Sequence, residues 1–343
     1  MYKNGSKFML FLMLFYLAMG FFVLPLALIG MGLGEEEISI LFRSPYFFIA
    51  QQLLLLLMPL LIWMFANRIS FKNFLKFEPL ELINVIIIVG IALLMQPGMM
   101  FVGGLVGLFS PNIIAEAVTG IMDYPFWLVV VTIAVTPSIV EELVFRGYIQ
   151  NQYEGLGIKK AAIISGLFFG IIHMNMQQFF YAFLAGVVFA YIVYYTKSII
   201  AGMLAHFVLN GSQLLMLRMA LLAESRHEEL VLAYEAAPLP EIEPIFAVIA
   251  IGVLALFTTP PAIYLLHTLV RRCKLRHEFA EPETNETNSQ SPMVYDRPLT
   301  EPVAEEPEHQ SPVVYDRPFA DPFLIAVVII FVAFIIYWRI NIG

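Results

Sequence analysis

Residues 125–153 read PFWLVVVTIAVTPSIVEELVFRGYIQNQY, an apolar segment of membrane-spanning length that contains Glu141, Glu142 and Arg146. A helix of roughly 20 apolar residues crosses the hydrocarbon core of a bilayer. Ionisable side chains at that depth cost on the order of several kcal/mol each and persist where they are paired or functional. The segment therefore predicts a membrane helix that carries a functional polar site.

The whole chain shares this apolar character. Of its 343 residues, 60% are hydrophobic and 13% are charged, whereas a soluble globular domain has about 25% charged residues. The sequence predicts an all-α, polytopic membrane helix bundle with eight or nine transmembrane helices. The apolar runs lie near residues 8–32, 46–67, 83–108, 125–153, 159–176, 178–196, 198–217, 245–270 and 322–340.

Basic and acidic residues alternate between the loops that join these runs. The basic loops are those that carry Lys3 and Lys7, Arg68, Lys72 and Lys76, Lys159 and Lys160, Lys197, and Arg271 to Arg276. Lys and Arg concentrate in cytoplasmic loops, so we predict a multi-pass protein of the cell (plasma) membrane with a cytoplasmic N-terminus. Its surroundings are the lipid bilayer.

The net charge of −8 argues against nucleic acid as a partner. The single cysteine, Cys273, excludes an intramolecular disulfide and a cysteine-built zinc site.

Five regions are predicted along the chain. They are the N-terminal transmembrane helices (1–122), a catalytic helical core (123–217), an acidic outer loop with the following transmembrane helix (218–276), a disordered Pro/Glu-rich linker (277–321) and a C-terminal transmembrane helix (322–343). In the linker, QSPMVYDRP at 290–298 recurs as QSPVVYDRP at 310–318. Two copies broken by Pro cannot form a stacked solenoid. We interpret the repeat as a duplicated linker, with a docking peptide presented twice as the alternative.

The first polar cluster contains two carboxylates with different predicted surroundings. Glu142 and Arg146 are four residues apart, so they lie on one helix face and can pair. Glu141 lies on the neighbouring stripe, where a carboxylate without a cationic partner suits a general base. A helix end at the cytoplasmic surface would also explain both acids. However, the helix continues to a turn at Gly155 to Gly157, which puts Glu141 about 21 Å from that turn.

The second cluster follows on the next helix. His173 lies about 24 Å from Gly157 along its own helix, so in an antiparallel hairpin it reaches a depth similar to that of Glu141. Phe169 is one turn away and packs beside it. A lone histidine in an apolar helix is usually a satisfied core residue. The matching depth of the glutamate favours a functional role here.

The third cluster is His206 with Asn210, again on one helix face. Asn210 and a protonated histidine can donate hydrogen bonds to a carbonyl oxygen that becomes negative in a transition state. Hydrogen bonding between helices explains the same two residues equally well. The sequence leaves both explanations open.

Glu-Glu-x-x-x-Arg, Phe-x-x-x-His and His-x-x-x-Asn, in this order on successive membrane helices, resemble the CAAX protease and bacteriocin-processing family of intramembrane proteases. Prenyl-protein endopeptidases of the Ras-converting type belong to this family. The resemblance covers roughly residues 125–213. It implies that Glu141 activates the hydrolytic water with help from His173. It implies that His206 and Asn210 bind the scissile carbonyl and stabilise its oxyanion. It gives supporting roles to Glu142, Arg146 and Phe169.

The family has been described both as metalloproteases and as glutamate-dependent proteases without an essential metal. Glu141, His173 and His206 could form a three-ligand Zn²⁺ site with an open position, and Glu142 would then have to act as the base. We favour the mechanism that requires no cofactor. The resemblance implies peptide or membrane-protein substrates: peptides with a lipidated or hydrophobic end that approach from the cytoplasmic side, leader peptides, bacteriocin-like peptides or membrane-protein segments.

Two other functions are compatible with the same polar core. A non-enzymatic bacteriocin-immunity or scaffolding membrane protein could retain it. A proton-coupled transporter could use buried Glu and His as a proton relay. A transporter commonly has paired halves with broken helices, and the helical runs show no internal repeat. We therefore rank the transporter last.

Overall fold

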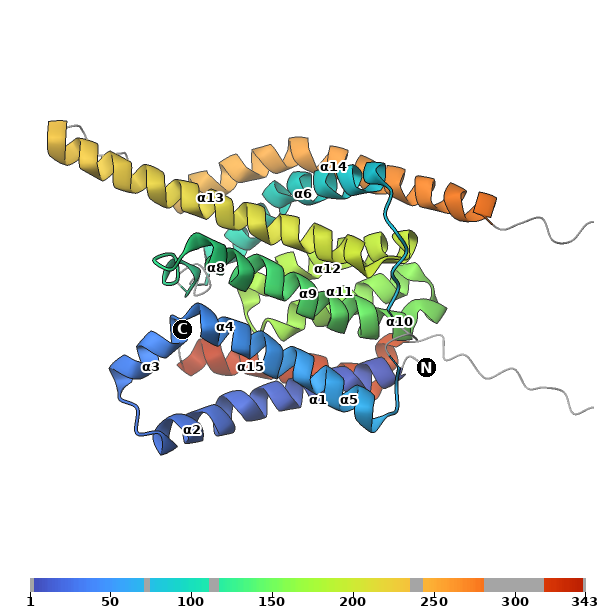
Figure 1. Ribbon diagram of the computed structural model, residues 1–343, viewed down its shortest axis with the longest axis horizontal. Helices are drawn as coiled ribbons and strands as arrows, with labels where there is room; N and C mark the ends of the chain where they lie inside the picture. The colour runs from blue at the N-terminus through green and yellow to red at the C-terminus, as the bar shows by residue number, and fades with distance from the viewer. Residues whose placement is uncertain (1–2, 71–74, 111–116, 235–242, 281–317, 342–343) are drawn as a thin grey trace, which may run out of the picture.

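The computed structural model describes residues 3–70, 75–110, 117–234, 243–280 and 318–341, which form an all-α bundle without a strand (Figure 1). Eight of its helical segments are long and apolar enough to cross a membrane by length and composition. The predicted fold class is confirmed. Helices suit a lipid bilayer because each helix satisfies its own backbone hydrogen bonds.

The helical segments follow the predicted runs in order. The N-terminal part contains α1 (Lys3–Ala18), η1 (Met19–Val23), α2 (Leu24–Gly30), α3 (Glu35–Phe42), α4 (Pro45–Gln52), η2 (Leu53–Leu57), α5 (Met58–Ala66) and α6 (Leu82–Gly107). The central part contains α8 (Phe126–Val130), η4 (Val131–Val135), α9 (Thr136–Glu142), η5 (Leu143–Ile149), α10 (Gln150–Tyr153), η6 (Glu154–Leu156), α11 (Ile158–Ile172), α12 (Met176–Thr196) and α13 (Ile199–Tyr234). The C-terminal part contains α14 (Pro244–Ala280), η7 (Pro318–Ala320) and α15 (Pro322–Asn341).

The helical span Phe126–Leu156 lies at the centre of the bundle. In its most apolar window 56% of residues are buried, against 17% for the span Pro322–Ile340. In Figure 1 it lies between a layer that contains α6, α13 and α14 and a layer that contains α1, α4, α5 and α15. Neighbouring helices therefore surround α9 and shield its polar residues from lipid.

The central span is not a uniform α-helix. Pro137 lies at the start of α9, and the π-helical segments η4 and η5 lie immediately before and after α9. A proline removes a backbone donor, and π-helical turns in helices occur frequently at functional sites. The two glutamates are the last two residues of α9 and so lie at the change from α-helix to π-helix.

α11 ends earlier than hydropathy predicts, at Ile172 instead of near residue 176. The backbone of Met174 adopts a left-handed conformation with φ of 48°. Asn175 is extended, and its side chain accepts a hydrogen bond from the backbone of Gln178 to cap α12. This tight turn places His173 at the end of α11, inside the bundle.

Two other helices end later than predicted. α13 continues to Tyr234 beyond the predicted residue 217, and Figure 1 shows it projecting past the rest of the bundle. Hydropathy marks only where a helix leaves the membrane, and residues 218–234 contain no Gly or Pro that would stop it. α14 continues to Ala280, so residues 277–280 of the predicted linker are helical. Apart from Pro318, the repeat at 290–318 lies outside the described residues, and the domain boundaries stay a prediction.

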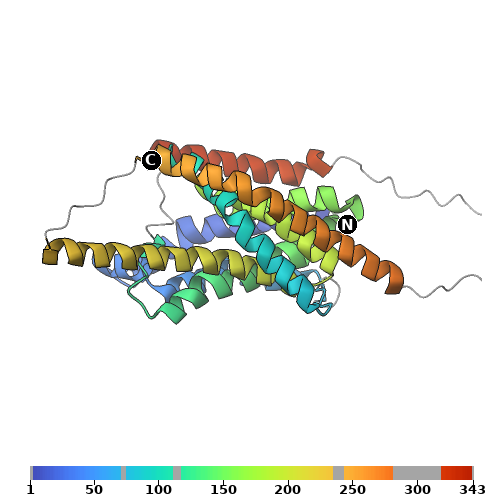
Figure 2. The ribbon, with the colours of Figure 1, turned by 90° about the horizontal axis from the view of Figure 1, so that it is seen from above.

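The two chain termini lie at opposite ends of the bundle in both views (Figures 1 and 2). This arrangement agrees with an odd number of passes, because the short α11 also runs through the bundle. Cys273 is buried and packs in the core cluster that includes Ile87 and Leu269. Its thiol is therefore a packing group of α14 within the described part of the chain.

Candidate active site

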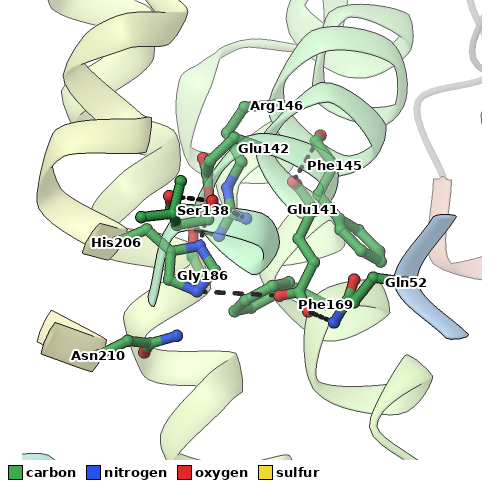
Figure 3. Close-up of polar contacts among 12 residues, drawn as sticks. Gln52, Ser138, Glu141, Glu142, Phe145, Arg146, Phe169, Gly186, His206 and Asn210 are labelled. Carbon is green, nitrogen blue, oxygen red and sulfur yellow. Dashed lines mark hydrogen bonds and ion pairs between the residues drawn. The ribbon is translucent and has the colours of Figure 1, made fainter. Parts of the chain in front are cut away.

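The structure brings all three predicted polar clusters together inside the bundle (Figure 3). Glu141 and Glu142 end α9, Arg146 follows in η5, and His206 lies on α13. Glu141 is 6% exposed and Glu142 is fully buried. These side chains meet at depth because the central span packs directly against α13.

Glu142 pairs with two nitrogen groups through a single oxygen. Its Oε1 atom accepts a hydrogen bond of 2.8 Å from Nη1 of Arg146 and lies 3.0 Å from Nδ1 of His206. The i, i+4 pair predicted from the sequence is therefore present, and His206 joins it from another helix. A buried charge needs such pairing because its desolvation is costly. These contacts hold α9, η5 and α13 together beside the proposed reactive groups.

The aromatic rings around Arg146 complete its surroundings. The guanidinium carbon lies 4.3 Å from the centre of the Phe169 ring and 5.3 Å from that of Phe189. Nη2 also donates to the carbonyl oxygen of Gly186 at 3.3 Å. Phe169 in turn presents its ring edge-on to His173 and His206. The Phe169 ring therefore contacts three of the polar side chains, and its supporting role stays a prediction.

Glu141 has different partners from Glu142. Its Oε1 atom accepts a hydrogen bond of 2.8 Å from Nε2 of Gln52, and its Oε2 atom lies 3.9 Å from Nε2 of His206. Figure 3 shows its carboxylate between these two side chains. Within the described residues it forms no ion pair with Lys or Arg. This agrees with the interpretation of Glu141 as the carboxylate that is not neutralised by its own helix.

Sequence reasoning missed Gln52. It comes from the end of α4, 89 residues before Glu141, and lies in an apolar run. The only signal in the sequence is the polar pair Gln51–Gln52 between Phe48 and a run of five leucines. That pair shows that this part of the helix is polar, but it does not indicate which neighbouring helix the pair contacts.

The ring of His173 has a defined tautomer. Its Nδ1 atom lies 2.6 Å from the carbonyl oxygen of Phe169. A carbonyl oxygen only accepts, so Nδ1 carries the hydrogen and Nε2 of the neutral ring has a free lone pair. This bond also occupies a carbonyl group in the last turn of α11, where helix acceptors lack partners.

Asn210 forms a hydrogen bond between helices. Its Nδ2 atom donates to the carbonyl oxygen of Ile133 at 3.1 Å. Pro137 lies four residues after Ile133 and has no N–H group to offer that oxygen. The packing role that the sequence left open for Asn210 is therefore real. One of its two N–H hydrogens is used in this way, and the other has no partner among the described residues.

The proposed reactive groups line one cavity of about 460 Å³. Glu141, His173, His206 and Asn210 are among its lining residues, whereas Glu142 and Arg146 are not. The similar depths predicted for Glu141 and His173 are thus matched by a shared cavity, which we call the chamber. Most of its other polar lining is carboxamide: Gln51, Gln52, Gln177, Gln178 and Gln213.

Glycines allow the helices around the site to approach closely. A Cβ atom on Gly170 would lie 2.8 Å from the backbone oxygen of Phe179, so α11 and α12 need this glycine. A Cβ atom on Gly202 would lie 2.7 Å from Oε2 of Glu142. The small residues noted in the sequence therefore set the distance between helices that bear the site.

The candidate zinc ligands of the alternative mechanism do not form a ligand set among the described residues. Among the described residues, no three His, Cys, Asp or Glu side chains are arranged to hold a metal ion. A zinc ion needs its donor atoms about 2.0–2.3 Å away in a tetrahedral arrangement. Glu141, His173 and His206 share the chamber without that geometry, so these residues as placed do not fit a zinc ion.

Residues 123–212 match the family described as type II CAAX prenyl endopeptidase Rce1-like. The matched range contains every predicted site residue from Glu141 to Asn210, and the resemblance stated from the motifs is confirmed. A search of curated proteins and a search of solved structures each found no match. The match supports a membrane protease, and the helices before residue 123 and after residue 212 lie outside it.

Proposed function

We propose that this chain is an intramembrane endopeptidase in which Glu141 activates a water molecule for peptide hydrolysis. The observation that carries the proposal is the position of Glu141. Its carboxylate is buried at the edge of the chamber, without an ion pair to Lys or Arg in the described residues, and next to two histidines. A carboxylate in such surroundings suits general base catalysis.

The addition step uses Glu141 as the proton acceptor. The water oxygen forms a bond to the scissile carbonyl carbon while a water proton passes to Glu141, and the π electrons of the carbonyl become a lone pair on the oxyanion. When the C–N bond then breaks, the carbonyl re-forms and Glu141 returns its proton to the leaving nitrogen. The products are a carboxylic acid and an amine. The free lone pair on Nε2 of His173 accepts a second hydrogen bond from the water and helps to orient it.

His206 and Asn210 supply the donors for the oxyanion. Nδ1 of His206 faces Glu142, so its Nε2 atom is the one directed toward Glu141 and the chamber. A protonated His206 would give the buried cluster two positive and two negative groups, which is a balanced arrangement. The free N–H hydrogen of Asn210 is the second donor. Donors fixed in place in a site of low dielectric stabilise a developing oxyanion strongly.

The carboxamide lining fits a peptide as the substrate. A peptide bond can be attacked only after its helix is unwound, and each bare backbone group in a membrane costs on the order of several kcal/mol. A carboxamide side chain can both donate and accept hydrogen bonds, and five glutamines line the chamber. They can bond to the N–H and C=O groups of an unwound peptide, so the lining offers replacements for backbone bonds that the substrate gives up.

The substrate class follows from the same lining. Apart from tyrosines, the ionisable residues that line the chamber are Glu141, His173 and His206, within the described chain. No other charge is present there to pair with a substrate side chain. We propose uncharged, apolar segments of membrane-associated peptides as substrates, including peptides with a lipidated or hydrophobic end.

The test is the isosteric change Glu141→Gln in the purified full chain, reconstituted in lipid nanodiscs. Cleavage of a library of internally quenched apolar peptides should fall by at least about 100-fold, the range for loss of a general base. Glu36→Gln on the exposed start of α3 is the control and should leave cleavage unchanged. Equal cleavage by Glu141→Gln and the parent would remove the assignment. It would favour an immunity or scaffolding role.

A further inference from the structure

A second cavity, of about 510 Å³, lies at one end of the bundle and shares no lining residue with the chamber. Its lining includes Leu105 and Val106 in the last turn of α6, Met176 in the first turn of α12, and Trp338 and Arg339 near the end of α15. All three helices belong to spans that are long and apolar enough to cross a membrane. Their ends meet at this cavity, so it lies near the level of the bilayer surface. We call it the interface cavity.

The lining of the interface cavity is mainly apolar and carries one charge. Its side chains are chiefly those of Leu, Val, Ile, Phe and Met, and Arg339 is its one ionisable residue within the described chain. Nη1 of Arg339 donates to the carbonyl oxygen of Phe109 at 3.0 Å, and the guanidinium forms no ion pair with a described Asp or Glu. Trp and Arg both anchor helices at the surface of a bilayer. An apolar cavity with one unpaired cation fits an amphiphile that has an acyl chain and an anionic headgroup.

The headgroup decides which amphiphile the cavity prefers. Lipid tails are as apolar as leucine side chains, so an acyl chain gains little when it moves from the bilayer into an apolar cavity. A guanidinium presents a planar fork of N–H donors that matches a phosphate group, and the contact with Phe109 uses one of its nitrogens. The hydrophobic end of a lipidated peptide would fill the apolar part but would bring no anion to Arg339. The charge of the cavity therefore favours a phospholipid of the surrounding membrane.

One short turn separates the interface cavity from the chamber. Around the connection between α11 and α12, His173, Gln177 and Gln178 line the chamber, whereas residues 174–176 line the interface cavity. The backbone of Met174 is left-handed, with φ of 48°. A residue other than glycine keeps that conformation only where its surroundings hold it in place. A molecule in the interface cavity therefore lies against the turn that positions His173.

We propose that the interface cavity binds one phospholipid, with its phosphate against Arg339 and an acyl chain along the apolar lining, and that this lipid stabilises the turn that positions His173. An acyl chain along this lining contacts residues 174–176 and so restricts the backbone that joins His173 to α12. Binding of the lipid is independent of the proposed function, whereas an effect on peptide cleavage rests on it.

Lipid binding is tested on the purified full chain in a nonionic detergent, after removal of copurified lipid. Native mass spectrometry counts the molecules of added dioleoylphosphatidylglycerol that each chain retains. We expect one tightly held lipid on the parent chain. Arg339→Gln should weaken its binding by at least about tenfold, the usual loss for a hydrogen bond to a charged group, and Arg339→Lys should restore most of it. Arg43→Gln, at an exposed arginine outside the lining, should leave binding unchanged.

Two further comparisons test the assigned contacts. Dioleoylglycerol has the same acyl chains without the phosphate and should bind to the parent chain at least about tenfold more weakly. Val106→Phe fills part of the apolar lining and should weaken phospholipid binding while Arg339 is intact. Equal binding of the two lipids to the parent chain, or of the phospholipid to the parent and Arg339→Gln chains, overturns the inference. Unchanged binding to the Val106→Phe chain would put the lipid outside the cavity and also overturns it.

Hydrogen exchange tests the effect on the turn. In the parent chain, the phospholipid should slow amide exchange of residues 173–179 by roughly tenfold or more, because it opposes local opening of this segment. The same lipid concentration should leave this exchange unchanged in the Arg339→Gln chain. A retained lipid that does not slow exchange in this segment of the parent chain overturns the link to His173.

Peptide cleavage separates the inference from the proposed function. Added phospholipid should raise kcat of the parent chain severalfold and should have little effect on that of Arg339→Gln. If no chain cleaves peptides while lipid binding and slower exchange are both observed, the lipid site stands and the protease assignment falls. If the parent chain cleaves peptides at a rate that the phospholipid does not change, the lipid has no part in positioning His173.

Discussion

Nδ1 of His206 lies 3.0 Å from Oε1 of Glu142, so a histidine on α13 shares the carboxylate oxygen that already holds Arg146. This contact joins two helices that are far apart in the sequence. The two neighbouring glutamates therefore have different surroundings. Glu142 pairs with Arg146 and His206, whereas Glu141 lines the chamber.

Glu142→Gln should therefore destabilise the fold. The variant leaves the guanidinium of Arg146 buried without its charge partner, which costs about 3–5 kcal/mol. Thermal unfolding in detergent should show a clearly lower midpoint. Glu81→Gln removes exposed pairs with Arg272 and Arg276 and should change stability by no more than about 1 kcal/mol. The double change Glu142→Gln with Arg146→Met should recover part of the loss, and no recovery would show that the pair is not the cause.

Asn210→Ala distinguishes a role of Asn210 in helix packing from a role as an oxyanion donor. Loss of the part-buried bond to Ile133 alone would cost about 0.5–1.5 kcal/mol in stability. Loss of an oxyanion donor would also lower kcat by roughly 100- to 1,000-fold with little change in KM. We expect both effects. A stability loss with unchanged kcat would assign Asn210 to helix packing only.

Treatment with a chelator tests our preference for a mechanism that requires no metal ion. Because Glu141, His173 and His206 do not form a metal-binding group among the described residues, we expect the purified chain to retain its peptide cleavage in the presence of EDTA or 1,10-phenanthroline. Elemental analysis should find less than one zinc ion per chain. Loss of activity that added Zn²⁺ restores would refute this and would require the three side chains to move together.

Much of this arrangement could be predicted from local sequence spacing. The apolar runs give the helices, and the four-residue spacing of Glu142 and Arg146 gives their ion pair. Counting residues from the turn at Gly157 gives Glu141 and His173 similar depths. These predictions succeed because each depends on rise and periodicity within one helix or one hairpin.

The rest depends on how helices rotate and pack against each other, which spacing does not fix. Nothing local indicates that Gln52 would reach Glu141 or that His206 would bond to Glu142.

Gly170→Ala and Gly211→Ala form a matched pair. An added methyl group at Gly170 would meet the backbone oxygen of Phe179 at 2.8 Å, so α11 must shift against α12. At Gly211 it would meet Cβ of Ala134 at 3.8 Å, an ordinary contact. We expect Gly170→Ala to lose about 1–3 kcal/mol of stability and to lower cleavage, because His173 is three residues away. Gly211→Ala should be neutral or slightly stabilising, since alanine is the better helix former. Equal stability and cleavage in the two variants would contradict the close approach.

Gln52→Leu tests whether an N-terminal helix outside the matched family domain orients the base. Nε2 of Gln52 donates to Glu141 at 2.8 Å, and leucine keeps the bulk of the side chain while removing that donor. A misdirected base should lower kcat by about 10- to 100-fold, as small errors in positioning do. Gln51→Leu is the control. Gln51 also lines the chamber but bonds to Tyr16, so its loss should change KM more than kcat. If the two variants change kcat and KM in the same way, Gln52 is only part of the chamber wall, and Glu141 takes its orientation from α9 and α13.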